Sequence, residues 1–400
     1  MAIDFQQVYE MIKTIGINAS ERKKALDDRR EKARLLFGFH ADQLEGLRRK
    51  VEIAKEADSG VRCALPLTER LDFHVLPPDL PQRVTVIAAD GSQIFPDRHL
   101  AVQYGLINVG AIIMRLNSNE APTVRAKSQL LFDDELYTPS GGPLTDGMLA
   151  LKRDLEERSM LCDLAKEFGQ DGEPVLTLTD GPIELWGARD GEEASLYEEN
   201  LRKYLEILLK TQTLGATAAG YIDKPFSDPV IRLLELTMAT DEDLKKQREF
   251  HPLRGVTDRW LFGEKNFLLL KPGERSAVFY YQSKSEKIYK GMLGLHFFYL
   301  NVSDNEKNPQ IARVDIPKWV VDDPAKLSLL HAVLIQQCRI MGAKPFPYLL
   351  HRAHESAVVT FPEKSQVEQM LILEMRRSGM EVGELSSKQS AKDSPSRSSY

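Results

Sequence analysis

The sequence has little cysteine and no long apolar run. Its three cysteines, Cys63, Cys162 and Cys338, are far apart and form no CxxC pair. This number and spacing exclude a zinc ribbon or a disulfide framework, so we expect reduced thiols and a cytoplasmic protein. The start, MAIDFQQVYEMIKTIG, lacks the basic and apolar regions of a signal peptide. Because no apolar run reaches the roughly eighteen residues of a membrane helix, we expect no contact with a membrane.

Several catalytic motifs and a basic excess are also missing. The sequence contains no GxxxxGK[ST], no GxGxxG after a strand and no GxSxG, which argues against a P-loop hydrolase, a dinucleotide-dependent enzyme and an α/β-hydrolase. The formal net charge of −6 is not typical of a free-standing nucleic-acid binder. An enzyme that collects carboxylates for metal, or one that relies on a partner to grip DNA, is compatible with this charge.

What the sequence does contain is enough apolar material for a large core, 42% of 400 residues. We expect a helical N-terminal extension over residues 1–75, a main domain over 80–375 with an irregular insertion at about 240–320, and a disordered serine-rich tail over 378–400. The N-terminal helices are interpreted as a solvated hairpin or dimerising arm. The alternative is a DNA-contacting arm that would use Arg29, Arg30, Arg48, Arg49 and Lys50.

The main domain is predicted to begin with three antiparallel strands and to continue with alternating helices and strands. The first strand starts at Val84 and is expected to turn at Ala89–Ser92, and Val102–Leu116 is interpreted as two strands with a turn at Asn108–Gly110. The later predicted elements are a helix over Thr145–Phe168, a strand from Val175 to Asp180, a helix over Glu192–Gly215 and a strand that ends at Asp223. We expect an α/β fold with a mixed five-stranded sheet flanked by helices.

Two apolar strands each run into Asp-Gly, in VTVIAADGS at 84–92 and in VLTLTDGP at 175–182. A carboxylate at the end of a buried strand is costly to desolvate unless it is paired or holds a cation. If the strands are neighbours, Asp90 and Asp180 repel each other, and two Mg²⁺ or Mn²⁺ ions about 4 Å apart would relieve this and promote phosphodiester cleavage. The alternative is that each is a turn aspartate, a residue favoured before glycine.

A third acid is expected on the helix that separates these strands. Glu156 and Glu157 lie in its middle, and periodicity does not distinguish them, although Glu156 is slightly favoured. Most glutamates within a helix simply pair with a lysine or arginine one turn away, so this interpretation stays open for both.

Two further segments carry candidate residues. Asp223 ends an apolar strand in GYIDKP and is either a further ligand or part of a strand-to-helix turn. His351 and His354 lie in YLLHRAHESA, three residues apart, where a histidine could bind metal or protonate a leaving group near neutral pH. A surface or core histidine pair is the alternative.

Taken in order, AADGSQ (88–93), LTDGPIELW (178–186), AGYIDKPFSDPVIRLLEL (219–236) and KPFPYLLHRAHESAVV (344–359) resemble the NurA nuclease family. The resemblance implies a ribonuclease H-like fold and a Mn²⁺-dependent (or Mg²⁺-dependent) 5′→3′ exonuclease and single-strand endonuclease with two ions. It also implies a homodimer that acts on DNA in end resection with a HerA-type hexameric ATPase.

The family's catalytic residues correspond to Asp90, Glu156 (with Glu157 as the rival), Asp180 and His354 in this chain. The metal ligands implied by the resemblance are Asp90, Glu156 and Asp180, together with Asp223, whose role is the least secure. Two other functions stay open: a non-catalytic adaptor that guides DNA for a translocase, and a two-metal hydrolase of small phosphoesters.

Overall fold

The computed structural model describes residues 3–80, 83–97, 100, 102–138, 140–170, 172–187, 193–245 and 249–379. The chain divides into two compact units. Unit 1 comprises Met1–Leu80 and Tyr221–Phe346, and unit 2 comprises Pro81–Gly220 and Pro347–Tyr400. Each unit buries its own cluster of apolar side chains.

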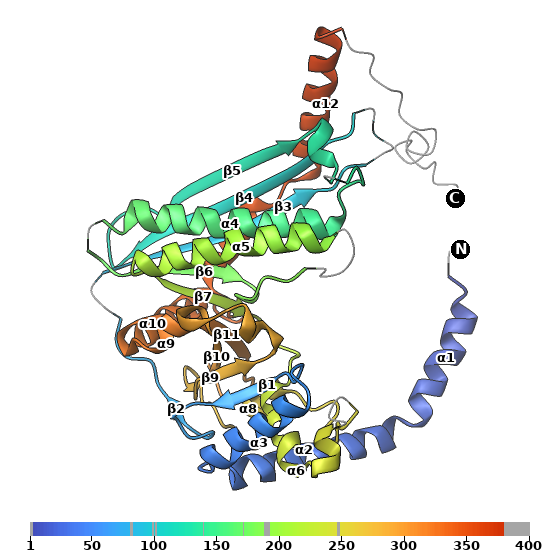
Figure 1. Ribbon diagram of the computed structural model, residues 1–400, viewed down its shortest axis with the longest axis vertical. Helices are drawn as coiled ribbons and strands as arrows, with labels where there is room; N and C mark the ends of the chain where they lie inside the picture. The colour runs from blue at the N-terminus through green and yellow to red at the C-terminus, as the bar shows by residue number, and fades with distance from the viewer. Residues whose placement is uncertain are drawn as a thin grey trace. The chain divides into compact units, whose positions relative to one another are not determined.

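Unit 2 is built on a mixed sheet with the strand order β5-β4-β3-β6-β7 (Figure 1). Strands β3, β4 and β5 form an antiparallel meander, and β6 joins β3 in parallel. The five strands are β3 (Val84–Ile94), β4 (Gly105–Leu116), β5 (Thr123–Leu131), β6 (Val175–Asp180) and β7 (Thr217–Ile222). This is the five-stranded mixed sheet predicted from the sequence.

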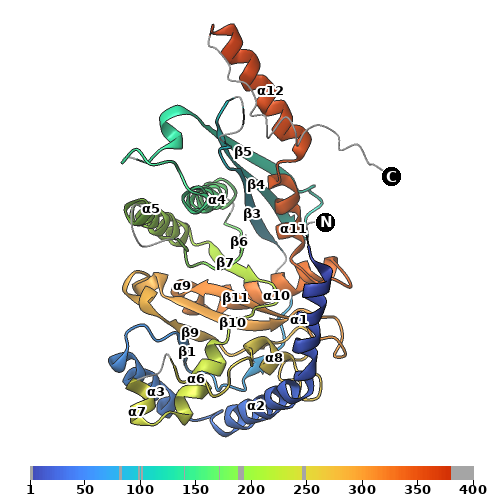
Figure 2. The same ribbon diagram turned by 90° about the vertical axis from the view of Figure 1, so that its right-hand side faces the viewer.

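Helices cover both faces of this sheet. Figure 2 shows α4 (Asp146–Phe168) and α5 (Glu193–Thr213) on one face and α11 (Tyr348–Ala357) on the other. Helix α4 begins as predicted, because the hydroxyl of Thr145 accepts a hydrogen bond from the backbone N–H of Met148. The remaining elements of unit 2 are the short helix η1 (Asp133–Leu136) and the helix α12 (Phe361–Arg377).

Two predicted turns in the meander were wrong. Strand β3 does not turn at Ala89–Ser92 but stays paired with β4 as far as Ile94. Strand β4 is one strand, since the Asn108 side chain is held within the sheet by the Ser128 hydroxyl and the Ala357 carbonyl. A Cβ atom on Gly110 would lie 2.7 Å from the backbone N of Ala357. This glycine therefore permits the close approach of α11 instead of forming a turn.

Unit 1 combines helices with an antiparallel sheet of order β1-β9-β10-β11, to which β2 and β8 add a short pair. Its strands are β1 (Cys63–Pro66), β2 (His74–Val75), β8 (Arg275–Ser276), β9 (Phe279–Gln282), β10 (Leu295–Asn301) and β11 (Ile311–Pro317). Its helices are α1 (Phe5–Ile17), α2 (Ala19–Phe39), α3 (Leu44–Ala57), α6 (Pro229–Met238), α7 (Asp241–Lys245), α8 (Asp258–Gly263), η2 (Lys284–Lys287), η3 (Gly291–Leu293), α9 (Lys318–Val321) and α10 (Pro324–Ile340).

Three helices lie between Phe5 and Ala57, as predicted, but they pack differently. Helices α2 and α3 contribute Phe37, Leu47 and Val51 to the core of unit 1. Helix α1 has no buried residue, and its Phe5 and Met11 side chains are more than half exposed. The N-terminal segment is thus partly core and partly an exposed amphipathic helix.

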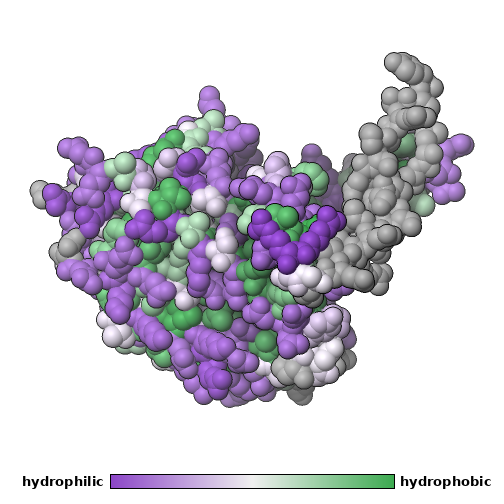
Figure 3. Space-filling view, turned by 90° about the horizontal axis from the view of Figure 1, so that it is seen from above, coloured by the Kyte–Doolittle hydropathy of each residue, from purple (hydrophilic) through white to green (hydrophobic). Residues whose placement is uncertain are grey.

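The three cysteines are buried and unpaired with one another. In the part of the chain that the structure describes, no helix is long and apolar enough to cross a membrane. On the face seen in Figure 3, hydrophobic residues are scattered among hydrophilic ones. The predicted disordered tail lies almost wholly outside the described residues, which end at Gly379.

Candidate active site

The candidate site lies where β6 ends beside β3. The last residue pair of these parallel strands is Ala89 with Thr179, so Asp90 and Asp180 are neighbours one residue further on. Strand β6 stops at Asp180, whereas β3 continues along β4. Because the sheet loses a strand at this point, a notch opens beside Asp90. The strand pairing that would bring the two carboxylates together is therefore present.

Both aspartates line a cavity of about 310 Å³ in unit 2. Its walls come from β3, α4, the end of β6, the segment that follows it, and α5. Besides Asp90 and Asp180, the cavity is lined by Arg153, Asp154, Glu157, Arg158, Thr179, Pro182, Glu184, Leu185, Trp186 and Tyr204. Five carboxylates and two guanidinium groups thus meet in one small volume.

The two glutamates of α4 have different surroundings. Glu157 lines the cavity and is buried, whereas Glu156 does not line it and forms an ion pair with Lys127 of β5 at 2.6 Å. Burial, together with the negative charges of Asp154 and Asp90, raises the pKa of Glu157 to about 8. The slight preference for Glu156 from the sequence is not supported by this geometry, which favours its rival Glu157.

Helix α11 brings a histidine to the opposite side of Asp90. The Nδ1 atom of His354 lies 2.7 Å from Oδ2 of Asp90, and the imidazole remains 63% exposed. A carboxylate that accepts a hydrogen bond from one imidazole nitrogen fixes the orientation of the ring and leaves the second nitrogen available for another partner. His351 lies elsewhere on this helix, where its Nε2 is 3.5 Å from the carboxylate of Glu355.

Asp223 belongs to unit 1 and follows β7. Its Oδ2 atom lies 3.7 Å from the Nζ of Lys224, and Lys224 adopts a positive φ of 45°. This is the local geometry of a tight turn before Pro225. The proposed role of Asp223 as a metal ligand stays a prediction.

Sequence reasoning missed Arg153 as part of the site. Its Nε lies 3.3 Å from Oε1 of Glu157 and its Nη2 lies 2.7 Å from Oδ1 of Asp154. A Cβ atom on Gly91 would lie 2.6 Å from Cγ of Arg153 and 2.5 Å from Oε1 of Glu157. Both side chains therefore lie directly against the backbone of β3, next to Asp90. The signal in the sequence is the glycine after Asp90, although the local pattern there predicts a turn.

The donor set of the cavity has the chemistry of a site for hard divalent cations. Carboxylate oxygens are the ligands preferred by Mg²⁺ and Mn²⁺, and their mutual repulsion favours a cation between them. As placed, no three or more His, Cys, Asp and Glu residues among those described are close enough together to hold a metal ion. The type of ligand that lines the cavity nevertheless fits a divalent ion.

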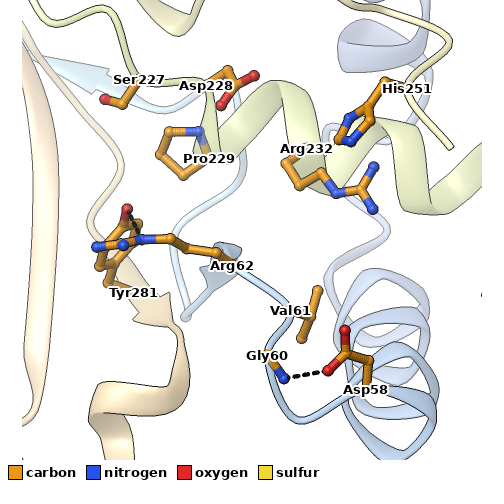
Figure 4. Close-up of a pocket in the computed structure, with 10 residues that line it drawn as sticks. All are labelled: Asp58, Gly60, Val61, Arg62, Ser227, Asp228, Pro229, Arg232, His251 and Tyr281. Atoms are coloured by element: carbon orange, nitrogen blue, oxygen red, sulfur yellow. Dashed lines mark hydrogen bonds between the residues drawn. The ribbon is translucent and has the colours of Figure 1, made fainter. Parts of the chain in front are cut away.

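A second cavity, of about 290 Å³, lies in unit 1 (Figure 4). There the Arg62 Nε donates to the hydroxyl of Tyr281 at 2.7 Å, and Arg232 forms an ion pair with Glu235 at 2.7 Å. Its cationic groups are thus engaged by neighbouring protein groups. It has no counterpart to the cluster of five carboxylates in unit 2.

Three comparisons place these features among known proteins. The sequence profile of the NurA domain matches residues 84–359. The chain is similar in structure to the NurA nuclease from Sulfolobus solfataricus, with 13% identity and a TM-score of 0.51 over 94% of this chain and 98% of that one. A lower similarity is found to the catalytic domain of human endonuclease V, with 14% identity and a TM-score of 0.29 over 82% of this chain and 98% of that one. No curated protein sequence matches the chain. The chain therefore has the fold of this NurA nuclease, and its mixed sheet flanked by helices is the α/β architecture expected from the sequence.

Proposed function

Because this chain belongs to the NurA family, we propose that it is a metal-dependent DNA nuclease. The observation that carries this proposal is the convergence of Asp90, Glu157 and Asp180 on one cavity at the notch of the sheet. We assign the acid of α4 to Glu157 instead of Glu156, since only Glu157 lines that cavity. When bound there, divalent ions would polarise the scissile phosphodiester and neutralise charge on the leaving oxygen.

In this proposal, three carboxylates and one histidine have different roles. Asp90, Glu157 and Asp180 would hold the ions through carboxylate oxygens. His354 is oriented by its hydrogen bond to Asp90 and exposed on its other side, so it would deliver a proton to the leaving oxygen or contact a phosphate. Thus Asp90 would serve both the metal and the histidine.

The finer properties follow from family membership. We propose two Mn²⁺ ions, with Mg²⁺ as the alternative, 5′→3′ exonuclease and single-strand endonuclease activity, and a role in DNA end resection. With a net charge of −6, the chain would gain affinity for DNA from a basic partner, as a HerA-type hexameric ATPase would provide. The exposed apolar side chains of α1, such as Phe5 and Met11, support a homodimer, because such residues favour burial against a second chain.

The test is cleavage of end-labelled single-stranded and double-stranded DNA in Mn²⁺, Mg²⁺ or EDTA. We expect cleavage in Mn²⁺ that is abolished by EDTA and reduced more than about 100-fold by Asp90→Ala or Asp180→Ala, because losing groups outside the ligand shell already reduces activity 10- to 100-fold. Asp163→Ala is the matched control, since Asp163 lies on α4 but is exposed. If the wild type stays inert with and without a HerA-type ATPase, the chain is a non-catalytic adaptor instead.

A further inference from the structure

The carboxylate cavity already contains a cation of its own. Arg153 lies one turn before Glu157 on α4, and its guanidinium is within ion-pair distance of Asp154 at 2.7 Å and Glu157 at 3.3 Å. Its side chain is 30% exposed, so the charge is partly withdrawn from water. The negative charge of Asp90 also acts on it and, with that of Asp154 and Glu157, raises the pKa of Arg153 against the effect of burial.

The backbone of β3 is shaped to accept this side chain. A Cβ atom on Gly91 would lie 2.6 Å from Cγ of Arg153, a separation that real Cβ atoms essentially never show, and 3.0 Å from its Cδ. The aliphatic part of Arg153 therefore lies against the strand beside Asp90, in space that a side chain at position 91 would occupy. An ordinary pair between residues of one helix would not require this space on the neighbouring strand.

The second arginine of the cavity has a different setting. The Nη2 of Arg158 donates to the carbonyl oxygen of Pro182 at 3.4 Å, and its guanidinium lies over the ring of Tyr204 at 5.6 Å. Arg153, in contrast, forms ion pairs with two acids of α4, Asp154 and Glu157. Carboxylates that share a cavity disfavour one another's ionised form, and a cation among them favours it.

We infer that the Arg153 guanidinium is a built-in counter-cation of the carboxylate cluster, which a divalent ion must displace before Asp90, Glu157 and Asp180 can hold it. This inference rests on the proposed function. Arg153 would therefore set the affinity of the site for metal, and once displaced its guanidinium would be available to a DNA phosphate.

The test is the affinity of the full chain for Mn²⁺ in the absence of DNA, measured by titration calorimetry. Arg153→Met keeps the apolar stem that packs against Gly91 and removes the charge. We expect Mn²⁺ to bind this variant at least about tenfold more tightly, because a charge at this distance shifts a carboxylate equilibrium by a factor of ten or more. Arg125→Met is the matched control, since Arg125 forms an exposed ion pair with Glu167 at 3.5 Å and does not line the cavity. It should change the affinity less than about twofold.

Thermal unfolding gives a second reading that does not depend on activity. In EDTA, Arg153→Met should unfold at a lower temperature than the wild type, and Mn²⁺ should raise its unfolding temperature by more. Arg153→Lys keeps a charge without the planar guanidinium, so its Mn²⁺ affinity and unfolding temperature should lie between those of the wild type and Arg153→Met. It replaces the methionine variant in the test if that variant does not fold. Equal or weaker Mn²⁺ binding by the variants would overturn the inference and leave the proposed nuclease intact. No Mn²⁺ binding by any of the proteins would remove both.

Discussion

Asp90-Gly91 lies inside a strand of 11 residues, whereas Asp180-Gly181 ends a strand and turns the chain. Gly181 has a positive φ of 95° and open space where a side chain would be. Gly91 is not in the left-handed region, but a side chain there would meet Arg153 and Glu157. The glycine of the Asp-Gly pair therefore permits a turn of the backbone after β6 and close packing of side chains against β3. Both pairs place an aspartate at the same notch.

Replacing each glycine with alanine separates the two roles and should give the largest difference. In Gly91→Ala the new methyl group would displace Arg153 and Glu157, which lowers the free energy of unfolding by about 1–3 kcal/mol through overpacking. It should also lower nuclease activity about 100-fold, because misplacing a site residue by about 1 Å has an effect of this size. Gly181→Ala should lower stability by about 1–2 kcal/mol through backbone strain alone.

Urea unfolding and DNA cleavage rates measure these two effects on each variant. The expected pattern is loss of stability in both variants, with a large loss of activity in Gly91→Ala only. If Gly181→Ala lost as much activity as Gly91→Ala, the two glycines would not differ in the way that the structure indicates.

The sequence was sufficient to predict what depends on local pattern. The apolar strands β3 and β6 and the capped helix α4 follow from periodicity and from residues that favour particular backbone shapes. The pairing of β3 with β6, which makes Asp90 and Asp180 neighbours, is a condition that the local pattern leaves open. The sequence was insufficient where a residue is explained by a distant contact. Gly91 and Gly110 were interpreted as turn residues, but their role is to let α4 and α11 approach β3 and β4, and no local pattern records that. Glu156 and Glu157 are adjacent, so only the packing of α4 on the sheet distinguishes them.

The burial of Glu157 also predicts a pH dependence of stability, of intermediate size. Burial and neighbouring acids raise the pKa of Glu157 from 4.5 to about 8. Between these values the folded protein without metal holds a proton that the unfolded chain has released, so its free energy of unfolding falls as the pH rises. Glu157→Gln removes this term.

As the pH rises between these two values, the free energy of unfolding of the wild type should fall relative to that of Glu157→Gln by about 1.4 kcal/mol per pH unit. Urea unfolding in EDTA at pH 6 and 7.5 measures it, and other titrating groups cancel in the difference between the two proteins. A difference that stays constant across this range would mean that Glu157 is already ionised in the folded protein, and so that the cluster is better neutralised than its contacts indicate.

The smallest effect is expected at the neighbour of Glu157 that points away from both Asp-Gly pairs. Glu156 and Lys127 form an ion pair in which the side chains are 26% and 57% exposed, and such pairs contribute about 0–1 kcal/mol. Glu156→Gln should therefore change the rate of DNA cleavage less than about twofold and the free energy of unfolding by less than about 1 kcal/mol. Glu157→Gln, in contrast, should abolish cleavage. Since the two substitutions are chemically identical and one residue apart, a difference between them can come only from their position relative to the notch. If Glu156→Gln were the inactive variant, α4 would have to rotate when metal binds. The close packing of Arg153 and Glu157 would then no longer explain the glycine at position 91.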